Sequence, residues 1–282
     1  RRQRQMCIRD RGKTTVINCM LALLKYDKGS IRIFGQEMVP DHYEVKKQIG
    51  IILQNVAVFD ELTVYENIDY FCGLYVKEKE KRKSLVKEAI AFVGLEDYQK
   101  TRPKKLSGGL LRRLNIACGI AHKPRLIILD EPTVAVDPQS RNRILEGIQE
   151  LNRQGATIVY TSHYMEEVEQ ICSRIAIMDH GRSIAVGTKE QLTGMIKTGE
   201  KVTIEAVVLS EEQLAGIREL PHVFAVDYQN DILTVQCTKA RHNLVRILHC
   251  LEEQGVAFGR VYSELPTLND VFLEITGKQL RD

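Results

Sequence analysis

Short apolar segments alternate with helical segments over most of the chain, from Gly12 to about Ile196. The segments Ile49–Leu53, Leu126–Leu129 and Ala156–Tyr160 consist almost entirely of apolar and β-branched residues, which is typical of strands covered on both faces. The segments between them have apolar residues at helical spacing and a charged face. Buried strands that alternate with helices predict an α/β fold with a mainly parallel sheet.

The pattern changes near residues 197–199, and we expect an accessory domain over residues 199–282. The segments predicted there, in chain order, are Val202–Leu209, Glu211–Arg218, Val223–Tyr228, Ile232–Cys237, Ala240–Glu253, Ala257–Ser263 and a last short helix at Leu268–Thr276. The first six alternate as strand, helix, strand, strand, helix and strand. This βαββαβ order is that of a ferredoxin-like split βαβ unit.

Composition excludes several classes of protein. With 44% hydrophobic and 27% charged residues, the chain is neither disordered nor of low complexity. Its apolar stretches are far shorter than the roughly 18 residues of a membrane-spanning helix. The seven cysteines are odd in number, scattered and never spaced as CxxC, which indicates a reducing compartment, no disulfide framework and no zinc site.

The positive charge of the chain lies in its first eleven residues. These contain five arginines and one aspartate, whereas the formal net charge of the whole chain is +3. The rest of the chain is therefore close to neutral. The charge pattern does not indicate a nucleic-acid-binding surface, and we expect no nucleic acid partner.

The string Gly12-Lys13-Thr14-Thr15 begins a predicted helix and resembles the second half of a phosphate-binding P-loop. Backbone N–H groups at a helix start can hold phosphate oxygens, Lys13 can reach the β- and γ-phosphates, and the Thr14 hydroxyl can ligate Mg²⁺. Taken alone, the string also fits an ordinary helix start at the surface. The full pattern requires a glycine at position 7, where this chain has Cys7, and a buried strand before it, which the preceding residues do not predict.

Leu126–Leu129 is followed directly by Asp130 and Glu131. Both carboxylates would lie at the C-terminal end of a buried strand, where open α/β sheets bind ligands. Asp130 could hold Mg²⁺ there, usually through water, and Glu131 could orient or deprotonate an attacking water. The alternative is a core strand that ends in a solvated acidic turn.

The string Leu106-Ser107-Gly108-Gly109 comes directly before the predicted helix Leu110–Ala121. Ser107 can cap this helix, and the two glycines allow the backbone to approach an anion at the positive end of the helix. A plain serine cap with a flexible loop is the alternative.

Together these strings resemble the nucleotide-binding subunit of ATP-binding-cassette (ABC) transporters. Residues 12–15 resemble the Walker A motif, residues 106–109 the family signature, and residues 126–132 the Walker B motif. The resemblance implies a P-loop NTPase fold over residues 12–198. It also implies a helical subdomain at about residues 55–106.

Three single residues extend the resemblance. Gln54 matches the Q-loop, Asp137 the D-loop, and His163 the switch histidine, although His163 alone would also fit a structural role. The site residues that the resemblance implies are catalytic Glu131, His163 and Gln54; ATP-contacting Gly12, Lys13, Thr14, Thr15, Ser107, Gly108, Gly109 and Asp137; and Mg²⁺-holding Thr14, Gln54 and Asp130.

Two residues depart from the family pattern. Leu110 stands where the family usually has glutamine, and Ala135 stands where a glycine is common before the D-loop aspartate. Neither removes a catalytic group, so they concern the geometry of the dimer interface. The resemblance implies that two subunits pair head to tail, with each ATP between the Walker motifs of one subunit and the Ser107 loop of the other.

The segment Pro266–Gly277 is similar to the tail of drug- and antibiotic-export ATPases of the daunorubicin- and linearmycin-resistance kind, which work with a separate permease. The alternative is a short amphipathic helix that packs on the C-terminal domain. The resemblance implies an ATP-hydrolysing subunit, peripheral on the cytoplasmic face of the membrane, that drives export of a drug, antibiotic or lipid-like substrate. The alternatives are a soluble ABC-type ATP switch without a permease, and an inactive truncated copy.

Residues 1–11 fit neither a strand nor P-loop chemistry. We therefore expect them to be foreign to the natural chain, which would begin some tens of residues earlier, and the nucleotide-binding domain to lack its N-terminal strands. Weak ATP binding and doubtful activity follow, because a cradle of backbone N–H groups needs the whole loop. The chain should also be unstable, since a missing central strand would leave Leu126–Leu129 partly uncovered.

Overall fold

The computed structural model describes residues 4–7 and 12–277, which divide into two compact units, one up to Val186 and one from Gly187 onward. The division comes earlier than the boundary expected between residues 198 and 199. Helix α8 (Lys189–Thr193) belongs to the second unit because it packs on helix α11 (Leu268–Thr276).

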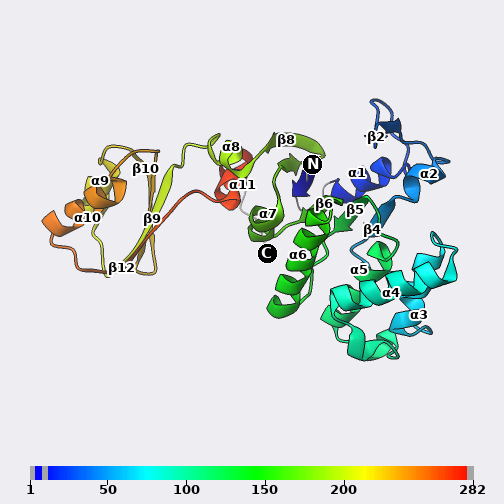
Figure 1. Ribbon diagram of the computed structural model, residues 1–282. Coiled ribbons are helices and arrows are strands. Elements are labelled where there is room, and N and C mark those ends of the chain that lie inside the picture. Colours follow the sequence, from blue (N-terminus) through cyan, green and yellow to red (C-terminus); the bar gives the residue numbers. More distant parts are fainter. Residues whose placement is uncertain (1–3, 8–11, 278–282) are drawn as a thin grey trace. The chain divides into compact units, whose positions relative to one another are not determined.

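The first unit is built on a six-stranded sheet with the strand order β4-β5-β6-β1-β7-β8. Figure 1 labels four of these strands, β4, β5, β6 and β8. Its strands are β1 (Arg4–Cys7), β4 (Ile49–Ile52), β5 (Leu126–Asp130), β6 (Thr157–Ser162), β7 (Ile175–Asp179) and β8 (Arg182–Gly187). The pairs β4–β5, β5–β6, β6–β1 and β1–β7 are parallel. The prediction of an α/β fold with a mainly parallel sheet is therefore confirmed.

The expectation that residues 1–11 form no strand is wrong for Arg4–Cys7. This segment forms β1 between β6 and β7, with Met6 opposite Thr161 on one side and Ala176 on the other. Its sequence has no apolar run from which a strand could be predicted, but pairing with two neighbours uses backbone groups and does not depend on side-chain type. The remaining expectations for residues 1–3 and 8–11 lie outside the described residues.

The expectation that Leu126–Leu129 is partly uncovered is also wrong, because all four side chains are at most 6% exposed. Strand β5 is flanked by β4 and β6, so its burial does not depend on the N-terminal strand. Ile127 and Leu129 face one apolar core, and Leu126 and Ile128 face another on the opposite side of the sheet.

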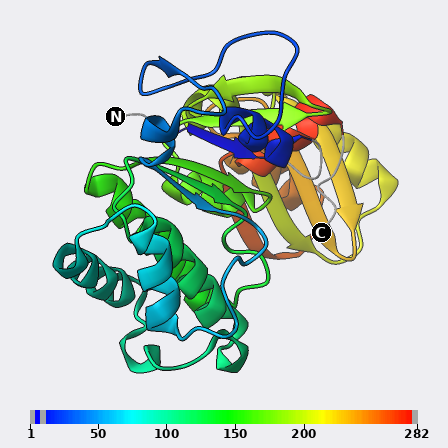
Figure 2. The same cartoon turned by 90° about the vertical axis from the view of Figure 1, so that its right-hand side faces the viewer.

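Helices cover both faces of this sheet (Figure 2). The helices of the first unit are α1 (Lys13–Met20), α2 (Tyr43–Lys46), α3 (Val64–Gly73), α4 (Lys79–Val93), α5 (Gly108–Ile120), α6 (Pro138–Arg153) and α7 (Met165–Ile171). Helices α1 and α2 lie on one side with the short hairpin of β2 (Arg32–Ile33) and β3 (Gln36–Glu37), whereas α3 to α6 share the core on the other side. Helices α3, α4 and α5 contact one another, and this group is called the helical subdomain below. It includes α5, which lies beyond the residues 55–106 expected for such a subdomain.

Helix α5 lies directly against β4. A Cβ atom on Gly50 would be 2.4 Å from the carbonyl oxygen of Gly119, and one on Gly119 would be 2.9 Å from Cδ1 of Ile52. No side chain larger than hydrogen fits at either position without a shift. This close approach fixes α5 beside the end of β4, after which Gln54 follows.

The second unit contains a four-stranded sheet with the order β10-β11-β9-β12, in which all three pairs are antiparallel. Its elements are α8, β9 (Glu200–Ala206), α9 (Glu211–Arg218), β10 (Val223–Gln229), β11 (Ile232–Cys237), α10 (Asn243–Glu253), β12 (Phe258–Glu264) and α11. Side chains from β9, β11, α9 and α10 form its apolar core. The carboxylate of Glu274 on α11 accepts hydrogen bonds from Lys197 N and Thr198 Oγ1, which ties α11 to the start of the unit.

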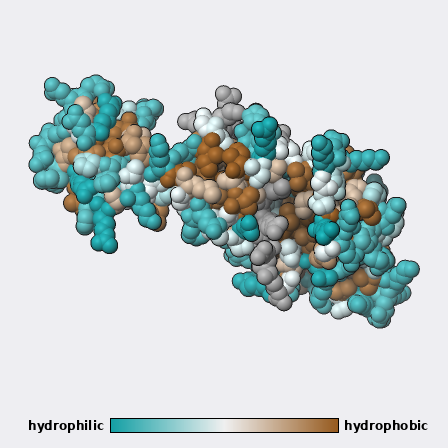
Figure 3. Space-filling view, turned by 90° about the horizontal axis from the view of Figure 1, so that it is seen from above, coloured by the Kyte–Doolittle hydropathy of each residue, from teal (hydrophilic) through white to brown (hydrophobic). Residues whose placement is uncertain are grey.

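Hydrophilic residues dominate the face shown in Figure 3, and apolar residues form separate patches on it.

Within residues 4–7 and 12–277, no helix is both long enough and apolar enough to cross a membrane. One exposed apolar group lies on the helical subdomain, where the rings of Phe59 and Tyr70 meet at 5.0 Å and Phe71 contacts both.

Candidate functional site

The start of α1 meets the C-terminal end of β5. Lys13 is only 6% exposed, and its Nζ forms an ion pair with Oε1 of Glu131. Oγ1 of Thr14 donates a hydrogen bond of 3.0 Å to Oδ2 of Asp130. The structure therefore brings the second half of the predicted P-loop to both predicted carboxylates. A solvated acidic turn is excluded, because Asp130 is 2% exposed and the Glu131 side chain 12%.

The end of β6 holds this acidic turn in place. Oγ1 of Thr161 donates to Oδ1 of Asp130, and the backbone N–H of Glu131 donates to both Oγ1 and the carbonyl oxygen of Thr161 at 3.1 Å. Glu131 itself has a φ of +50°, a left-handed conformation that is unfavourable for a residue with a side chain. Such conformations persist where the surroundings impose them and are frequent at functional sites.

His163 follows β6 and is half-buried. Its Nδ1 lies 3.5 Å from Oε2 of Glu131, a contact that becomes an ion pair when the imidazole is protonated. Its ring lies against Tyr164, with the centroids 4.1 Å apart. The Glu131 carboxylate is thus contacted by Lys13 through one oxygen and by His163 through the other.

Gln54 lies at the neighbouring strand end. Strands β4 and β5 are parallel, and their last paired residues are Ile52 and Leu129. Gln54 comes two residues after Ile52 and Glu131 two residues after Leu129, so both follow the same edge of the sheet. The Gln54 side chain is exposed, while its carbonyl oxygen accepts a hydrogen bond from Arg112. Of the three expected Mg²⁺ ligands, Thr14 and Asp130 are in direct contact, and Gln54 is placed at the same edge of the sheet.

Ser107 and Asp137 belong to a second group of predicted site residues. Ser107 caps α5 by accepting from Leu110 N at 3.3 Å, and Asp137 caps α6 by accepting from Ser140 N at 2.9 Å. The bonds from Ser140 lower the pKa of Asp137 below its usual value. A Cβ atom on Gly109 would be 2.7 Å from Oγ of Ser140, so the glycine allows the two loops to touch.

The two residues that depart from the family pattern differ in how well they fit their positions. Ala135 has a φ of +57°, a conformation that glycine adopts without strain. Leu110 is partly buried and packs against the core of the helical subdomain. Leu110 therefore makes an apolar contact on α5, whereas Ala135 adopts a backbone conformation that is unfavourable for a residue with a side chain.

Two buried charged residues near the site, Arg112 and Glu167, belong to none of the motifs found in the sequence and were not predicted as site residues. Arg112 on α5 donates to backbone carbonyls at the ends of β4 and β5. Glu167 on α7 accepts from the hydroxyl groups of Thr133, Tyr160 and Ser162, and its charge and the burial together raise the pKa of Tyr160. One signal existed for Arg112: it shares the i, i+4 row of α5 with the buried residues Ile116 and Ile120.

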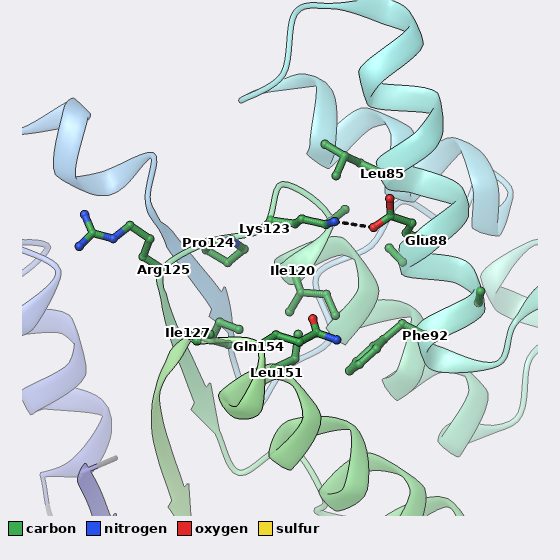
Figure 4. Close-up of a pocket in the computed structure, with 15 residues that line it drawn as sticks. Leu85, Glu88, Phe92, Ile120, Lys123, Pro124, Arg125, Ile127, Leu151 and Gln154 are labelled. Carbon is green, nitrogen blue, oxygen red and sulfur yellow. Dashed lines mark ion pairs between the residues drawn. The ribbon is translucent and has the colours of Figure 1, made fainter. Parts of the chain in front are cut away.

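A cavity of about 500 Å³ lies between α4, α5 and α6 (Figure 4). Apolar side chains such as Leu85, Phe92 and Leu151 line most of it, and Lys123 pairs with Glu88 at 2.5 Å beside it. None of the predicted site residues lines this cavity.

Comparisons with known proteins show that the chain is similar to ATP-binding proteins of ABC transporters. A family model described as ABC transporter matches residues 11–134. The linearmycin resistance ATP-binding protein LnrL of Bacillus subtilis (strain 168) is 37% identical over 274 residues, which cover 96% of this chain and 88% of that protein. The daunorubicin resistance ATP-binding protein DrrA3 of Streptomyces coeruleorubidus is 32% identical, with 96% and 85% covered. A Nod factor export ATP-binding protein I of Rhizobium sp. (strain N33) is 31% identical, with 95% and 86% covered.

Solved structures show the same fold for about two thirds of the chain. The ATP-binding subunit of an ABC transporter superposes with a TM-score of 0.62 at 24% identity, over 68% of this chain and 81% of that one. A dimeric ATP-binding cassette in a post-hydrolysis state with ADP and Pi superposes with a TM-score of 0.60 at 25% identity, over 66% and 84%.

Proposed function

The chain belongs to the family of ABC transporter ATP-binding proteins, and from that premise we propose that it hydrolyses ATP to drive export through a separate permease. The relatives named for linearmycin and daunorubicin resistance support a drug, antibiotic or lipid-like substrate. The observation that carries the proposal is the meeting of Lys13 and Thr14 with Asp130 and Glu131, four residues from two segments more than 100 residues apart.

The start of α1 is suited to hold the ATP phosphates. Gly12 caps the helix with a φ of +115°, which leaves the first N–H groups of α1 available for phosphate oxygens. Lys13 lies in this turn with its amine directed at the acidic end of β5. The amine is therefore positioned to bind the β- and γ-phosphates once it leaves Glu131.

The residues present fit a magnesium ion. The hydroxyl of Thr14, the carboxylate of Asp130 and the amide oxygen of Gln54 are oxygen donors of the kind that Mg²⁺ prefers. When bound, Mg²⁺ neutralises charge that develops on the transferred phosphoryl group. Thr161 orients Asp130 for this task by donating to its other oxygen.

Glu131 is the residue positioned to activate water. Its carboxylate ends a buried strand, and its two oxygens face Lys13 and His163. When the phosphates of ATP replace Glu131 as the partner of Lys13, the Glu131 carboxylate is free to accept a proton from the attacking water. His163 contacts Glu131 directly and would bind the γ-phosphate of ATP from this position.

The second group of residues supports a head-to-tail dimer. Ser107 and Gly108 are exposed at the start of α5, where an anion from a second subunit could bind. Asp137 lies beside them at the start of α6. The likeness to a dimeric cassette supports the same arrangement.

The permease contact is proposed for the exposed aromatic group of the helical subdomain, Phe59 and Tyr70 with Phe71. This would place the subunit on the cytoplasmic face of the membrane. The strand order β10-β11-β9-β12 supports a ferredoxin-like arrangement for the accessory unit.

Two measurements on the full chain test this function. Steady-state release of phosphate from Mg·ATP tests the ATPase, and co-purification with a permease expressed from the neighbouring reading frame tests the transport role. ATPase activity in a chain that also co-purifies with the permease supports the proposal. ATPase activity in a chain that binds no permease would instead support the soluble ATP switch, and absence of activity in a folded chain would support the inactive copy.

A further inference from the structure

Arg112 has all five of its N–H donors bonded to backbone carbonyl oxygens. Its side chain lies on α5 and the residue is 4% exposed. The acceptors are the carbonyl oxygens of Pro132 (from Nε, 2.8 Å), Leu53 and Gln54 (from Nη1, 2.9 and 2.7 Å), and Asp130 and Glu131 (from Nη2, 3.4 and 2.6 Å). A guanidinium has five such donors, so its bonding capacity is filled.

These acceptors come from two loops only. Leu53 and Gln54 follow β4, whereas Asp130 is the last residue of β5 and Glu131 and Pro132 form the turn directly after it. The two strands are adjacent and parallel, and β-ladder pairing fixes them only as far as Ile52 and Leu129. Beyond that pair, Arg112 is a bridge that joins the two loops directly.

Burying a guanidinium is costly, and burial lowers the pKa of Arg112, while the nearby charge of Asp130 acts in the opposite direction. The cost is offset only when hydrogen bonds satisfy the group, as they do here. A lysine at this position has one compact ammonium and cannot span two loops with planar, paired donors. The geometry therefore depends on the guanidinium and not on positive charge alone.

Arg112 also lies little more than one helical turn from Ser107, the cap of α5. The helix that presents the Ser107 loop therefore carries the bridge between the Gln54 and Glu131 loops. This connection runs within one rigid element of the chain.

We propose that Arg112 is a positioning residue that sets the spacing between Gln54 and Glu131 and ties both to the helix of the Ser107 loop. The inference rests on the proposed ATPase function. Arg112 does not contact Lys13 or Thr14 through any of its five donors, so it acts on the hydrolytic step and leaves nucleotide binding to other residues.

The test compares Arg112→Lys and Arg112→Met with wild type in the full chain. The matched control is Arg113→Lys, because Arg113 is the next residue on α5 and donates to the carbonyls of Val93 and Gly94 in the helical subdomain. Three quantities are measured on each protein: kcat for Mg·ATP, equilibrium ATP affinity, and the thermal unfolding midpoint.

We expect both Arg112 variants to lose about 10- to 100-fold in kcat, since displacement of reacting groups by about 1 Å has this effect. ATP affinity should stay within about twofold of wild type, and Arg113→Lys should keep both quantities. Unchanged kcat in the Arg112 variants, or an equal loss of kcat in Arg113→Lys, would overturn the proposal. So would a parallel loss of ATP affinity and thermal stability in Arg112→Lys, which marks a merely structural role. Lack of ATPase activity in the wild-type protein would refute the proposed ATPase function, which distinguishes that outcome from a failure of the Arg112 proposal alone.

Discussion

Lys13 and Glu131 form an ion pair although they are 118 residues apart in the sequence, and both side chains are largely buried. One is the residue expected to hold phosphate and the other the residue expected to activate water. Each charge neutralises the other. In the proposed mechanism, ATP phosphates replace Glu131 as the partner of Lys13, and the same exchange frees the carboxylate for the attacking water.

The first prediction concerns Cys7, which ends β1 where the P-loop pattern has a glycine. Replacing Cys7 with glycine should strengthen ATP binding, because a phosphate cradle needs close backbone approach at this point. Calorimetric titration with Mg·ATP measures the change, and Cys19→Gly on α1 controls for a general effect of cysteine removal. Equal affinity of Cys7→Gly and wild type would show that the incomplete motif does not limit binding.

The second prediction concerns the Ser107 loop. Ser107→Arg should block ATP-driven dimerisation, because a long cation replaces a small cap on an exposed surface. Loss of the cap itself should lower the free energy of unfolding by only about 1 kcal/mol. Nucleotide affinity and dimer fraction are measured separately, with Ser107→Asn as the control that retains capping. If affinity falls together with dimerisation, the loop has a structural role instead.

Much of the fold could be predicted because it depends on local patterns. The apolar run Leu126–Leu129 forms a buried strand, and the predicted helix Glu211–Arg218 has the same bounds in the structure. The positions of Lys13 at a helix start and of Glu131 directly after a buried strand were also predicted, but the ion pair between them was not.

Other features depend on contacts that no local pattern records. Strand β1 is held by backbone pairing with two neighbours, and the bonds of Arg112 depend on where two distant loops place their carbonyls. The division at Gly187 depends on the packing of α8 against α11, more than 70 residues later in the chain.

The third prediction uses this division. A chain that ends at Gly187 should keep nucleotide affinity within about twofold, because every predicted site residue lies before that point. A chain that ends at residue 199 should be less soluble, since α8, whose Leu192 is fully buried, would lose its contacts with α11. Light scattering and nucleotide titration of both truncations check this. Loss of nucleotide binding in a folded chain ending at Gly187 would refute the separation of the units.

The fourth prediction concerns pH. Burial lowers the pKa of His122 from 6.5 to about 4, and its ring stacks on Tyr75 at 4.0 Å. The unfolded chain binds this proton more readily, so the contribution of neutral His122 is present above pH 6.5 and is lost as the pH falls toward 4. Each unit of pKa difference corresponds to about 1.4 kcal/mol.

His122→Phe keeps the stacking and removes the titration. Denaturant unfolding at pH 7.5 and pH 5 should show a smaller loss of stability at pH 5 for this variant than for wild type. His249→Phe, at an exposed position on α10, serves as the control. The same pH dependence in His122→Phe and wild type would contradict the assignment.

The most direct test of the ATPase site is the steady-state hydrolysis of Mg·ATP by Glu131→Gln, with ATP affinity measured on the same protein. The substitution removes the proposed base and the charge that competes for Lys13, and exposed Glu166→Gln on α7 is the matched control. We predict that turnover falls by about 10²- to 10⁴-fold, while ATP binds at least as tightly as to wild type. Turnover equal to that of wild type in a folded Glu131→Gln protein would contradict the account.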